Sequence, residues 1–202
     1  MKIGIFGGTF NPPHKMHKQI AIELLNNKYL DKVIYVPVSD NYNKPNILNG
    51  IDRVKMLELM ISNIDDILSS KIEVSSFEVD GSLHTINTLN HFKTVYPDDD
   101  IYFICGTDNL DDFHRWNSFE EILKNYKLLV ISRDEYNYDE IIKKFGDYSK
   151  NIFLAPISSK KISSTQIRKE IIKNGFSNKL NNYIDNSTID YLKNIDILKY
   201  WN

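Results

Sequence analysis

Short apolar runs alternate along this chain with segments in which apolar residues recur at every third or fourth position. The runs have the length of buried strands and predict strands at 2–6, 32–36, 71–74, 101–105, 128–131 and 152–155. The helical spacing predicts helices at 17–26, 53–64, 85–95, 140–145, 164–174 and 188–197. Because strands and helices alternate from end to end, the pattern predicts an α/β fold in which a doubly wound parallel sheet carries helices on both faces.

Turn residues support these boundaries and indicate where a ligand would bind. Pro37 ends the second strand, and Gly175 follows the helix at 164–174 as a helix-terminating glycine. The polar stretch from Ser39 to Gly50 is long for a loop in a compact domain, and such loops are commonly functional. Ligands of open α/β sheets bind beyond the carboxyl ends of the strands, so candidate chemistry is expected in the loops that follow them.

Length and composition fit one globular domain. The chain has 202 residues, 42% hydrophobic and 26% charged, which predicts a single domain over 1–202 whose C-terminal part, from about 160, is helical. The net charge of -2 provides no basic field for nucleic acid or a membrane surface. The single cysteine, Cys105, ends an apolar run and is expected to be a packed thiol in a reducing compartment rather than a nucleophile. The chain shows neither a signal-peptide pattern nor an apolar stretch of membrane-spanning length, so a cytoplasmic location is expected.

The first candidate site follows the first strand, in the stretch Gly7-Gly8-Thr9-Phe10-Asn11-Pro12-Pro13-His14-Lys15-Met16-His17. Gly7 and Gly8 lack Cβ atoms where the backbone would approach a ligand closely, and the next helix points its free N–H groups at the same place. His14 and His17 are three residues apart and are therefore expected to be neighbours on one helical face, where imidazoles can donate hydrogen bonds to phosphate. The alternative is a tight strand–helix turn with two surface histidines.

The second candidate site lies at the start of the helix at 164–174. Ser163, Ser164 and Thr165 offer capping side chains and free N–H groups there. Arg168 follows one turn later as a fork-shaped donor for the same anion. The alternative is an ordinary capped amphipathic helix, but two phosphate motifs at opposite ends of one α/β chain favour the functional interpretation of both.

Both stretches resemble signatures of the nucleotidylyltransferase superfamily, which shares HIGH-type chemistry with class I aminoacyl-tRNA synthetases. The first resembles [GS]-x-[TS]-F-[DN]-P-x-H-x-x-H, with Met16 where glycine is usual, and the segment from Ile162 to Arg168 resembles IS-S-T-x-I-R. The resemblance implies a Rossmann-like HIGH-type nucleotidylyltransferase fold, ATP as a substrate, and catalytic roles for His14, His17 and Arg168. The residues that it implies for ATP binding are Gly7, Gly8, Thr9, Phe10, Asn11, His14, His17, Gly106, Asp108, Ile162, Ser163, Ser164, Thr165 and Arg168.

The middle of the chain resembles the bacterial nicotinate-nucleotide adenylyltransferases. The segments that carry this resemblance are Val36-Pro37-Val38 with Asn43-Lys44, Arg53-Val54-Lys55-Met56-Leu57-Glu58-Leu59, Phe77-Glu78 with Ser82-Leu83-His84-Thr85-Ile86-Asn87-Thr88-Leu89, Gly106-Thr107-Asp108 with Phe113-His114-Arg115-Trp116, and Ile131-Ser132-Arg133. This chain departs from the family in lacking a histidine beside Lys44 and in having His84 where tyrosine is usual. The resemblance implies a substrate-binding role for Lys44, His84, Thr85, Trp116 and Arg133.

The physical chemistry of these residues suits a pyridine nucleotide. Trp116 could stack on a nicotinate ring, although a loop residue that fills the core is the alternative. Thr85 is expected to begin a helix whose backbone N–H could bind a carboxylate. Lys44 could meet a phosphate or a carboxylate, and Asp108 could bind a ribose hydroxyl.

The resemblance implies an adenylyltransferase that moves AMP from ATP to nicotinate mononucleotide, giving nicotinate adenine dinucleotide and pyrophosphate in NAD biosynthesis. The expected cofactor is Mg²⁺ held mainly through the ATP phosphates, without a metal site of the protein's own. The expected partners are ATP and nicotinate mononucleotide, with no nucleic acid and no membrane, and the question of a homo-oligomer stays open. The alternatives are a pantetheine-phosphate adenylyltransferase, a nicotinamide-mononucleotide adenylyltransferase, and a nucleotide-binding protein without turnover.

Overall fold

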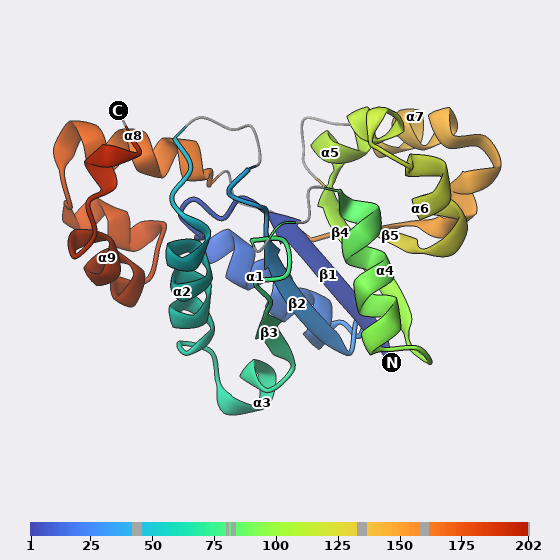
Figure 1. The fold of residues 1–202 in the computed structure, drawn as a ribbon, viewed down its shortest axis with the longest axis horizontal. Coiled ribbons are helices and arrows are strands. Elements are labelled where there is room, and N and C mark those ends of the chain that lie inside the picture. Colours follow the sequence, from blue (N-terminus) through green and yellow to red (C-terminus); the bar gives the residue numbers. More distant parts are fainter. Residues whose placement is uncertain (42–45, 80, 82–83, 133–136, 158–161, 202) are drawn as a thin grey trace.

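The computed structural model describes residues 1–41, 46–79, 81, 84–132, 137–157 and 162–201. Within these residues it contains a six-stranded sheet whose strands all run parallel, in the order β3-β2-β1-β4-β5-β6 (Figure 1). The strands are β1 (Lys2–Gly8), β2 (Lys32–Pro37), β3 (Ile72–Val74), β4 (Asp100–Gly106), β5 (Lys127–Ile131) and β6 (Ile152–Ala155). The predicted α/β fold with a doubly wound parallel sheet is confirmed.

The helices connect these strands, and several of the α-helices have fewer than eight residues. The α-helices are α1 (Lys15–Asn26), α2 (Gly50–Ile61), α3 (Asp66–Ser69), α4 (Thr85–Val95), α5 (Thr107–Asp112), α6 (Phe119–Asn125), α7 (Tyr138–Ile142), α8 (Ser164–Asn174) and α9 (Asn186–Lys193). The 3-10 segments are η1 (Phe113–Arg115), η2 (Lys143–Asn151), η3 (Asn178–Asn182) and η4 (Ile197–Lys199).

Two hydrophobic cores lie on opposite faces of the sheet, because successive side chains of a strand point to opposite sides. In β2, Ile34 and Val36 pack into one core, and Val33 and Tyr35 pack into the other. Helices α4 to α7 cover the first core, and α1 and α2 cover the second (Figure 1). This two-sided burial explains why the strands read as nearly continuous apolar runs.

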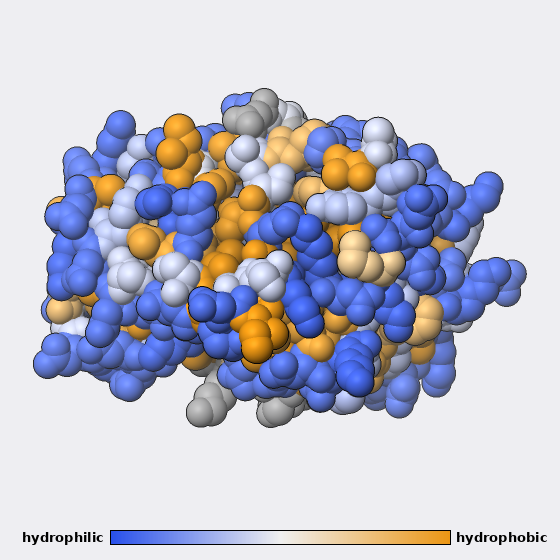
Figure 2. Space-filling model, turned by 90° about the horizontal axis from the view of Figure 1, so that it is seen from below, coloured by the Kyte–Doolittle hydropathy of each residue, from blue (hydrophilic) through white to orange (hydrophobic). Residues whose placement is uncertain are grey.

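The C-terminal elements form a third cluster against α2, beside the sheet (Figure 1). Trp201, which is 1% exposed, packs there with Leu48 and Met56, and the Tyr191 hydroxyl donates to Asp52 of α2 at 2.8 Å. In the view from below, hydrophobic residues gather near the middle of the molecule and hydrophilic residues dominate both ends (Figure 2).

The structure differs from the predicted helices in several stretches, and α3 and η3 are two short helices that the pattern does not predict. The structure places α5, η1 and α6 between β4 and β5, where the pattern predicts no helix, because pieces of three to seven residues are too short for an apolar stripe to repeat. The helix predicted at 140–145 is shared between α7 and η2, which bends at Gly146 (φ 49°). The helix predicted at 188–197 is α9 at 186–193, followed by η4.

Across the described part of the chain, no helix has both the length and the apolar character needed to cross a membrane.

Candidate active site

The carboxyl ends of β1 and β4 form the edge of the sheet at which the candidate site lies. These strands are neighbours, and the strand order reverses between them, with β2 and β3 on one side and β5 and β6 on the other. The chain leaves β1 towards α1 on one face and leaves β4 towards α5 on the opposite face. Ligands of open α/β sheets bind at such a switch point.

Gly7 and Gly8 end β1 and leave room for aromatic rings of the protein itself. A Cβ on Gly7 would lie 3.1 Å from the Phe103 ring, and a Cβ on Gly8 would lie 2.9 Å from the Phe10 ring. We expected these glycines to allow the close approach of a ligand. In the structure, the rings of Phe103 and Phe10 lie close to the positions that Cβ atoms on Gly7 and Gly8 would occupy.

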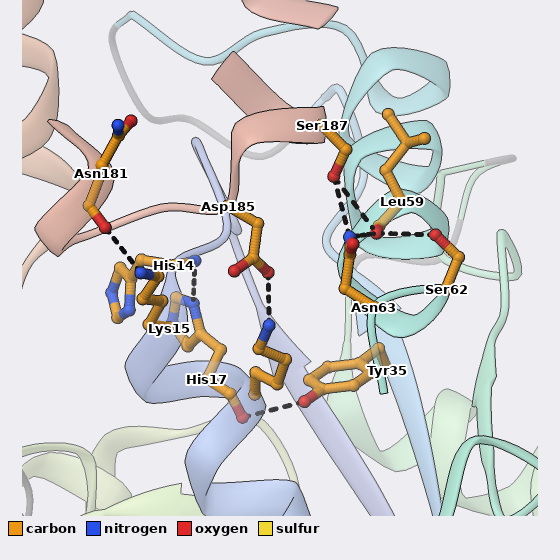
Figure 3. Close-up of polar contacts among 11 residues, drawn as sticks. His14, Lys15, His17, Tyr35, Leu59, Ser62, Asn63, Asn181, Asp185 and Ser187 are labelled. Atoms are coloured by element: carbon orange, nitrogen blue, oxygen red, sulfur yellow. Dashed lines mark hydrogen bonds and ion pairs between the residues drawn. The ribbon is translucent and has the colours of Figure 1, made fainter. Parts of the chain in front are cut away.

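His14 and His17 lie side by side at the start of α1, as predicted. Their rings stack with centroids 3.6 Å apart and planes inclined by 17° (Figure 3). His14 is the residue that caps the helix, and its backbone N–H donates to Nδ1 of His17 at 3.1 Å. Because Nδ1 accepts this hydrogen bond, a neutral His17 carries its ring proton on Nε2, which makes Nε2 the donor of this ring.

An aromatic cluster supports the His17 ring. The Tyr35 hydroxyl donates to the His17 carbonyl at 2.8 Å, and the Phe10 ring meets the imidazole edge to face at 5.0 Å. Phe6 stacks on Tyr35 at 5.3 Å and completes the cluster. Phe10 is 1% exposed and has a positive φ of 46°, and its buried ring packs against His17.

The C-terminal motif lies directly against the first loop. Ser163 caps α8 by accepting from the N–H of Gln166 at 3.2 Å. The Ser164 hydroxyl donates to the Pro12 carbonyl at 2.9 Å, and Arg168 donates to the Asn11 carbonyl at 2.8 Å. The structure therefore brings together two motifs that are about 150 residues apart in sequence, with separations of 152 and 157 residues at these bonds.

Arg168 is half-buried in this contact, and burial lowers the pKa of its guanidinium. Its Nη2 donates to the Thr165 hydroxyl at 3.2 Å. Ile162 packs between the second core and the C-terminal cluster, so its side chain anchors the motif.

Further polar contacts tie the C-terminal elements to α1 (Figure 3). The backbone N–H of Lys15 donates to the Tyr183 carbonyl at 2.8 Å, and its Nζ donates to the Asn181 carbonyl at 2.5 Å. Lys18 forms an ion pair with Asp185 at 2.6 Å. These contacts fix the start of α1, where both histidines lie, relative to the segment between α8 and α9.

Asn11 and Met16 of the first motif use their side chains within the protein. Asn11 is 3% exposed; its Nδ2 donates to the Asn46 carbonyl at 2.6 Å, and its Oδ1 accepts from the Leu48 N–H at 3.1 Å. Met16 is 4% exposed in the second core. Met16 stands where glycine is usual in the resembled signature, and the second core accommodates its side chain.

The exit from β4 carries the other residues predicted for ATP. Gly106 caps α5, and Asp108 is half-buried in its first turn, where a carboxylate is favourable. Cys105 is 3% exposed, and burial raises the pKa of its thiol to about 12, with a smaller contribution from Asp108. The prediction of a packed thiol is confirmed.

The residues predicted for the second substrate are only partly described. Thr85 begins α4 as predicted, and His84, which precedes it, is exposed. Trp116 is half-buried against Phe113 at 4.9 Å and Phe103 at 5.7 Å, so it lies beside the ring that covers Gly7. Lys44 and Arg133 lie outside the described residues.

Two buried charged residues near the site were not predicted from the sequence. Arg53 is completely buried in α2, and Glu78 is 8% exposed before α4. Burial raises the pKa of Glu78 to about 7, while Thr88 and Arg53 oppose that rise. The sequence feature that could have indicated the burial of Arg53 is its position four residues before Leu57, on the apolar face of its helix.

Among the described residues, no group of three or more histidine, cysteine or carboxylate side chains could hold a metal ion.

Comparisons with known proteins agree on one family. A family model described as cytidylyltransferase-like matches residues 5–170. A Clostridium tetani protein named probable nicotinate-nucleotide adenylyltransferase is 36% identical over 180 residues, which covers 85% of this chain and 88% of that protein. A Caldicellulosiruptor bescii protein of the same name is 37% identical over 177 residues, with coverage of 85% and 87%. The solved structure of Plasmodium falciparum nicotinic acid mononucleotide adenylyltransferase complexed with NaAD is similar with a TM-score of 0.84 and 25% identity, covering 98% of both chains.

Proposed function

This chain belongs to the nicotinate-nucleotide adenylyltransferase family, and from that premise we propose that it transfers the adenylyl group of ATP to nicotinate mononucleotide. The products are nicotinate adenine dinucleotide and pyrophosphate, a step of NAD biosynthesis. The Plasmodium falciparum relative was solved in complexes with NaAD and with APC, which supports nucleotide substrates here.

The contact between the two phosphate motifs is the observation that carries this proposal. Ser164 and Arg168 donate to the carbonyls of Pro12 and Asn11, a few residues before the stacked His14–His17 pair. A single triphosphate can therefore reach the start of α1 and the start of α8 at once. Both helix starts present N–H groups to an anion.

The reaction needs no nucleophile from the protein. An oxygen of the acceptor phosphate attacks the α-phosphorus in line, a new P–O bond forms, and the bond from the α-phosphorus to the oxygen that bridges to the β-phosphate breaks. Pyrophosphate leaves with that electron pair. The protein contributes positioning and stabilisation of the charge that develops on the phosphate oxygens.

Each motif has a separate part in that stabilisation. Nε2–H of His17 and the His14 ring donate to oxygens of the α- and β-phosphates. Ser164, Thr165 and Arg168 hold the β- and γ-phosphates and then the leaving pyrophosphate. The first loop lines the nucleotide through Gly7, Gly8, Thr9 and the backbone of Phe10 and Asn11. Gly106 and Asp108 line it at the adjacent strand end. Ile162 and Ser163 lie beside the phosphates.

The acceptor would bind on the side of the site formed by α4 and the loop of Trp116. Trp116 is half-buried against Phe103 and Phe113, an arrangement that suits stacking on a nicotinate ring. The start of α4 at Thr85, with His84 before it, suits the nicotinate carboxylate. Lys44 and Arg133 are proposed as further acceptor contacts.

Adenylyl transfer from ATP generally uses a divalent cation, and we propose Mg²⁺ for this chain. The residues present fit an ion bound mainly by phosphates and water, which is how Mg²⁺ commonly binds with nucleotides. When bound, it would add positive charge beside the phosphate oxygens.

An assay with three acceptors tests the proposal. The protein is incubated with ATP, Mg²⁺ and nicotinate mononucleotide, nicotinamide mononucleotide or phosphopantetheine, and pyrophosphate release is measured against a mixture without acceptor. We expect the largest kcat/KM with nicotinate mononucleotide. A larger value with either other acceptor would reassign the substrate, and no release with any of them would contradict the proposed activity.

A further inference from the structure

Arg53 is a buried arginine that no step of the proposed reaction uses. Its side chain is 0% exposed in the first turns of α2, and burial lowers the pKa of the guanidinium. Asp40, 2.7 Å from Nη2, opposes that lowering, but the Asp40 carboxylate is itself 46% exposed. Burial of a charge is costly unless its polar atoms are bonded. The other bonds of this guanidinium must therefore offset the cost.

Those bonds go to three backbone carbonyls in the two loops at the site. Nη1 of Arg53 donates to Thr9 at 3.2 Å, in the loop from β1 to α1. Nη2 donates to Val38 at 2.7 Å and Nε donates to Leu48 at 2.8 Å, near the two ends of the loop from β2 to α2. Asn11 joins the same loops again, because its Oδ1 accepts from the Leu48 N–H. One planar side chain thus holds the first phosphate loop against its neighbour.

Glu78 extends this network to α4. Its Oε1 accepts from the Thr88 hydroxyl at 2.6 Å in the first turns of α4, and its carboxylate is attracted by Arg53. A Cβ on Gly50 would lie 2.3 Å from Val79 Cγ1, so the chain after Glu78 packs tightly against the first residue of α2. The network therefore runs from the first phosphate loop, through α2, to the helix whose start faces the acceptor side.

We infer that Arg53 and Glu78 are positioning residues that hold the first phosphate loop and the start of α4 at a fixed separation for in-line transfer. This inference rests on the proposed function. An apolar residue could fill the space of Arg53, but it could not bind three carbonyls. In-line attack is sensitive to such placement, since a displacement of about 1 Å can cost about 10²-fold in rate.

The first test is Arg53→Lys, with Lys55→Met as the control on an exposed part of the same helix. A lysine keeps the charge but concentrates its donors on one atom, so it cannot span the same carbonyls. We expect kcat per folded molecule to fall by about 10²-fold, while the Kd of ATP measured without acceptor changes far less. Lys55→Met should match the wild type.

The second test is Thr88→Val, which keeps the shape of the side chain and removes the hydroxyl that donates to Glu78. We expect the KM for nicotinate mononucleotide to rise and the KM for ATP to stay near the wild-type value, because this residue lies on the acceptor side. This variant also decides the inference if Arg53→Lys fails to fold. Wild-type kinetics in every folded variant, with only thermal stability lowered, would overturn the inference.

Amide hydrogen exchange without substrates separates the inference from the proposed function. In Arg53→Lys we expect faster exchange than in the wild type and in Lys55→Met at residues 7–14. In Thr88→Val we expect faster exchange at 84–88. Unchanged exchange in both Arg53→Lys and Thr88→Val would overturn the inference. Faster exchange at these residues would support it. Both conclusions hold even if the wild type is inactive with all three acceptors.

Discussion

At the scale of single residues, the site depends on how tightly His17 is held. Its Nδ1 accepts from the His14 N–H, its carbonyl accepts from Tyr35, and its ring rests against Phe10. These contacts fix both the orientation of the ring and the position of its proton before a ligand arrives. Preorganised donors of this kind lower the barrier because they need no reorganisation during the reaction.

Replacement of His17 separates its proposed catalytic role from its local structural role. We expect His17→Ala to lower kcat by about 10²–10³-fold, the usual loss for one preorganised donor. His17→Asn offers an oxygen near the former Nδ1, so it should keep the bond to His14 and the fold, yet lose kcat to a similar extent. Steady-state kinetics and thermal melts of both variants, with exposed His114→Ala as control, measure this. Near-normal turnover of His17→Asn would contradict a role for Nε2.

At the scale of elements, the two helix starts at the site are built differently. The start of α1 is capped through the His14–His17 pair, whereas α8 is capped by the Ser163 hydroxyl, which accepts from Gln166 N–H. In α8 the capping residue also precedes the two residues that reach towards the first loop, Ser164 and Arg168. The cap therefore sets the point at which the phosphate motif becomes helical.

Loss of this cap should lower stability by a predictable amount. We expect Ser163→Ala to reduce the free energy of unfolding by about 1 kcal/mol, because the Gln166 N–H loses its acceptor. Ser177→Ala is the matched control, since Ser177 precedes η3 without a side-chain cap bond among the described residues. Urea titrations of the three proteins measure the difference, and an equal loss in both variants would show that the Ser163 cap adds nothing specific.

At the scale of the whole molecule, the fold keeps a carboxylic acid buried between its helices. Glu78 is 8% exposed and bonded to Thr88, with the Arg53 guanidinium and its partner Asp40 as the neighbouring charges. Burial raises the pKa of Glu78 from 4.5 to about 7. The folded state therefore favours the protonated acid, and the stability of the whole molecule is linked to pH through this group.

The sign of that linkage follows from the raised pKa. The contribution of Glu78 to stability is fully present below pH 4.5 and is lost as the pH rises towards about 7, with a total loss of about 3 kcal/mol. We expect the unfolding free energy of the wild type to fall relative to that of Glu78→Gln as the pH rises over this range. Urea titrations from pH 4.5 to 8 measure it, with Glu58→Gln on the surface of α2 as control. A pH-independent difference for Glu78→Gln would contradict the raised pKa.

Local sequence patterns predicted most of the fold and part of the candidate site. The strands and the long helices were predictable because burial on two faces and on one helical stripe leaves periodic apolar positions. The spacing of His14 and His17 predicted that they are neighbours, and the structure adds that their rings stack. The short helices α5 and α6 were not predictable, since they contain fewer than two full helical turns.

The role of Arg53 could not be predicted from the sequence, because its partners come from separate segments. Thr9 is 44 residues away from it in sequence and Val38 is 15 residues away. Its position on the apolar face of α2 indicates burial, but the sequence does not indicate which groups it contacts. Its function depends on which carbonyls the fold brings to it.

The sequence by itself determined the alternation of strands and helices, the two phosphate motifs and the resemblance to one enzyme family, because each depends on residues that are close in the chain. Only the tertiary structure decided that Arg168 meets Asn11, that Phe10 supports His17, and that buried charges link the two sides of the site. Hydrogen bonds and packing act through space, so residues far apart in the sequence become partners only when the sheet is assembled.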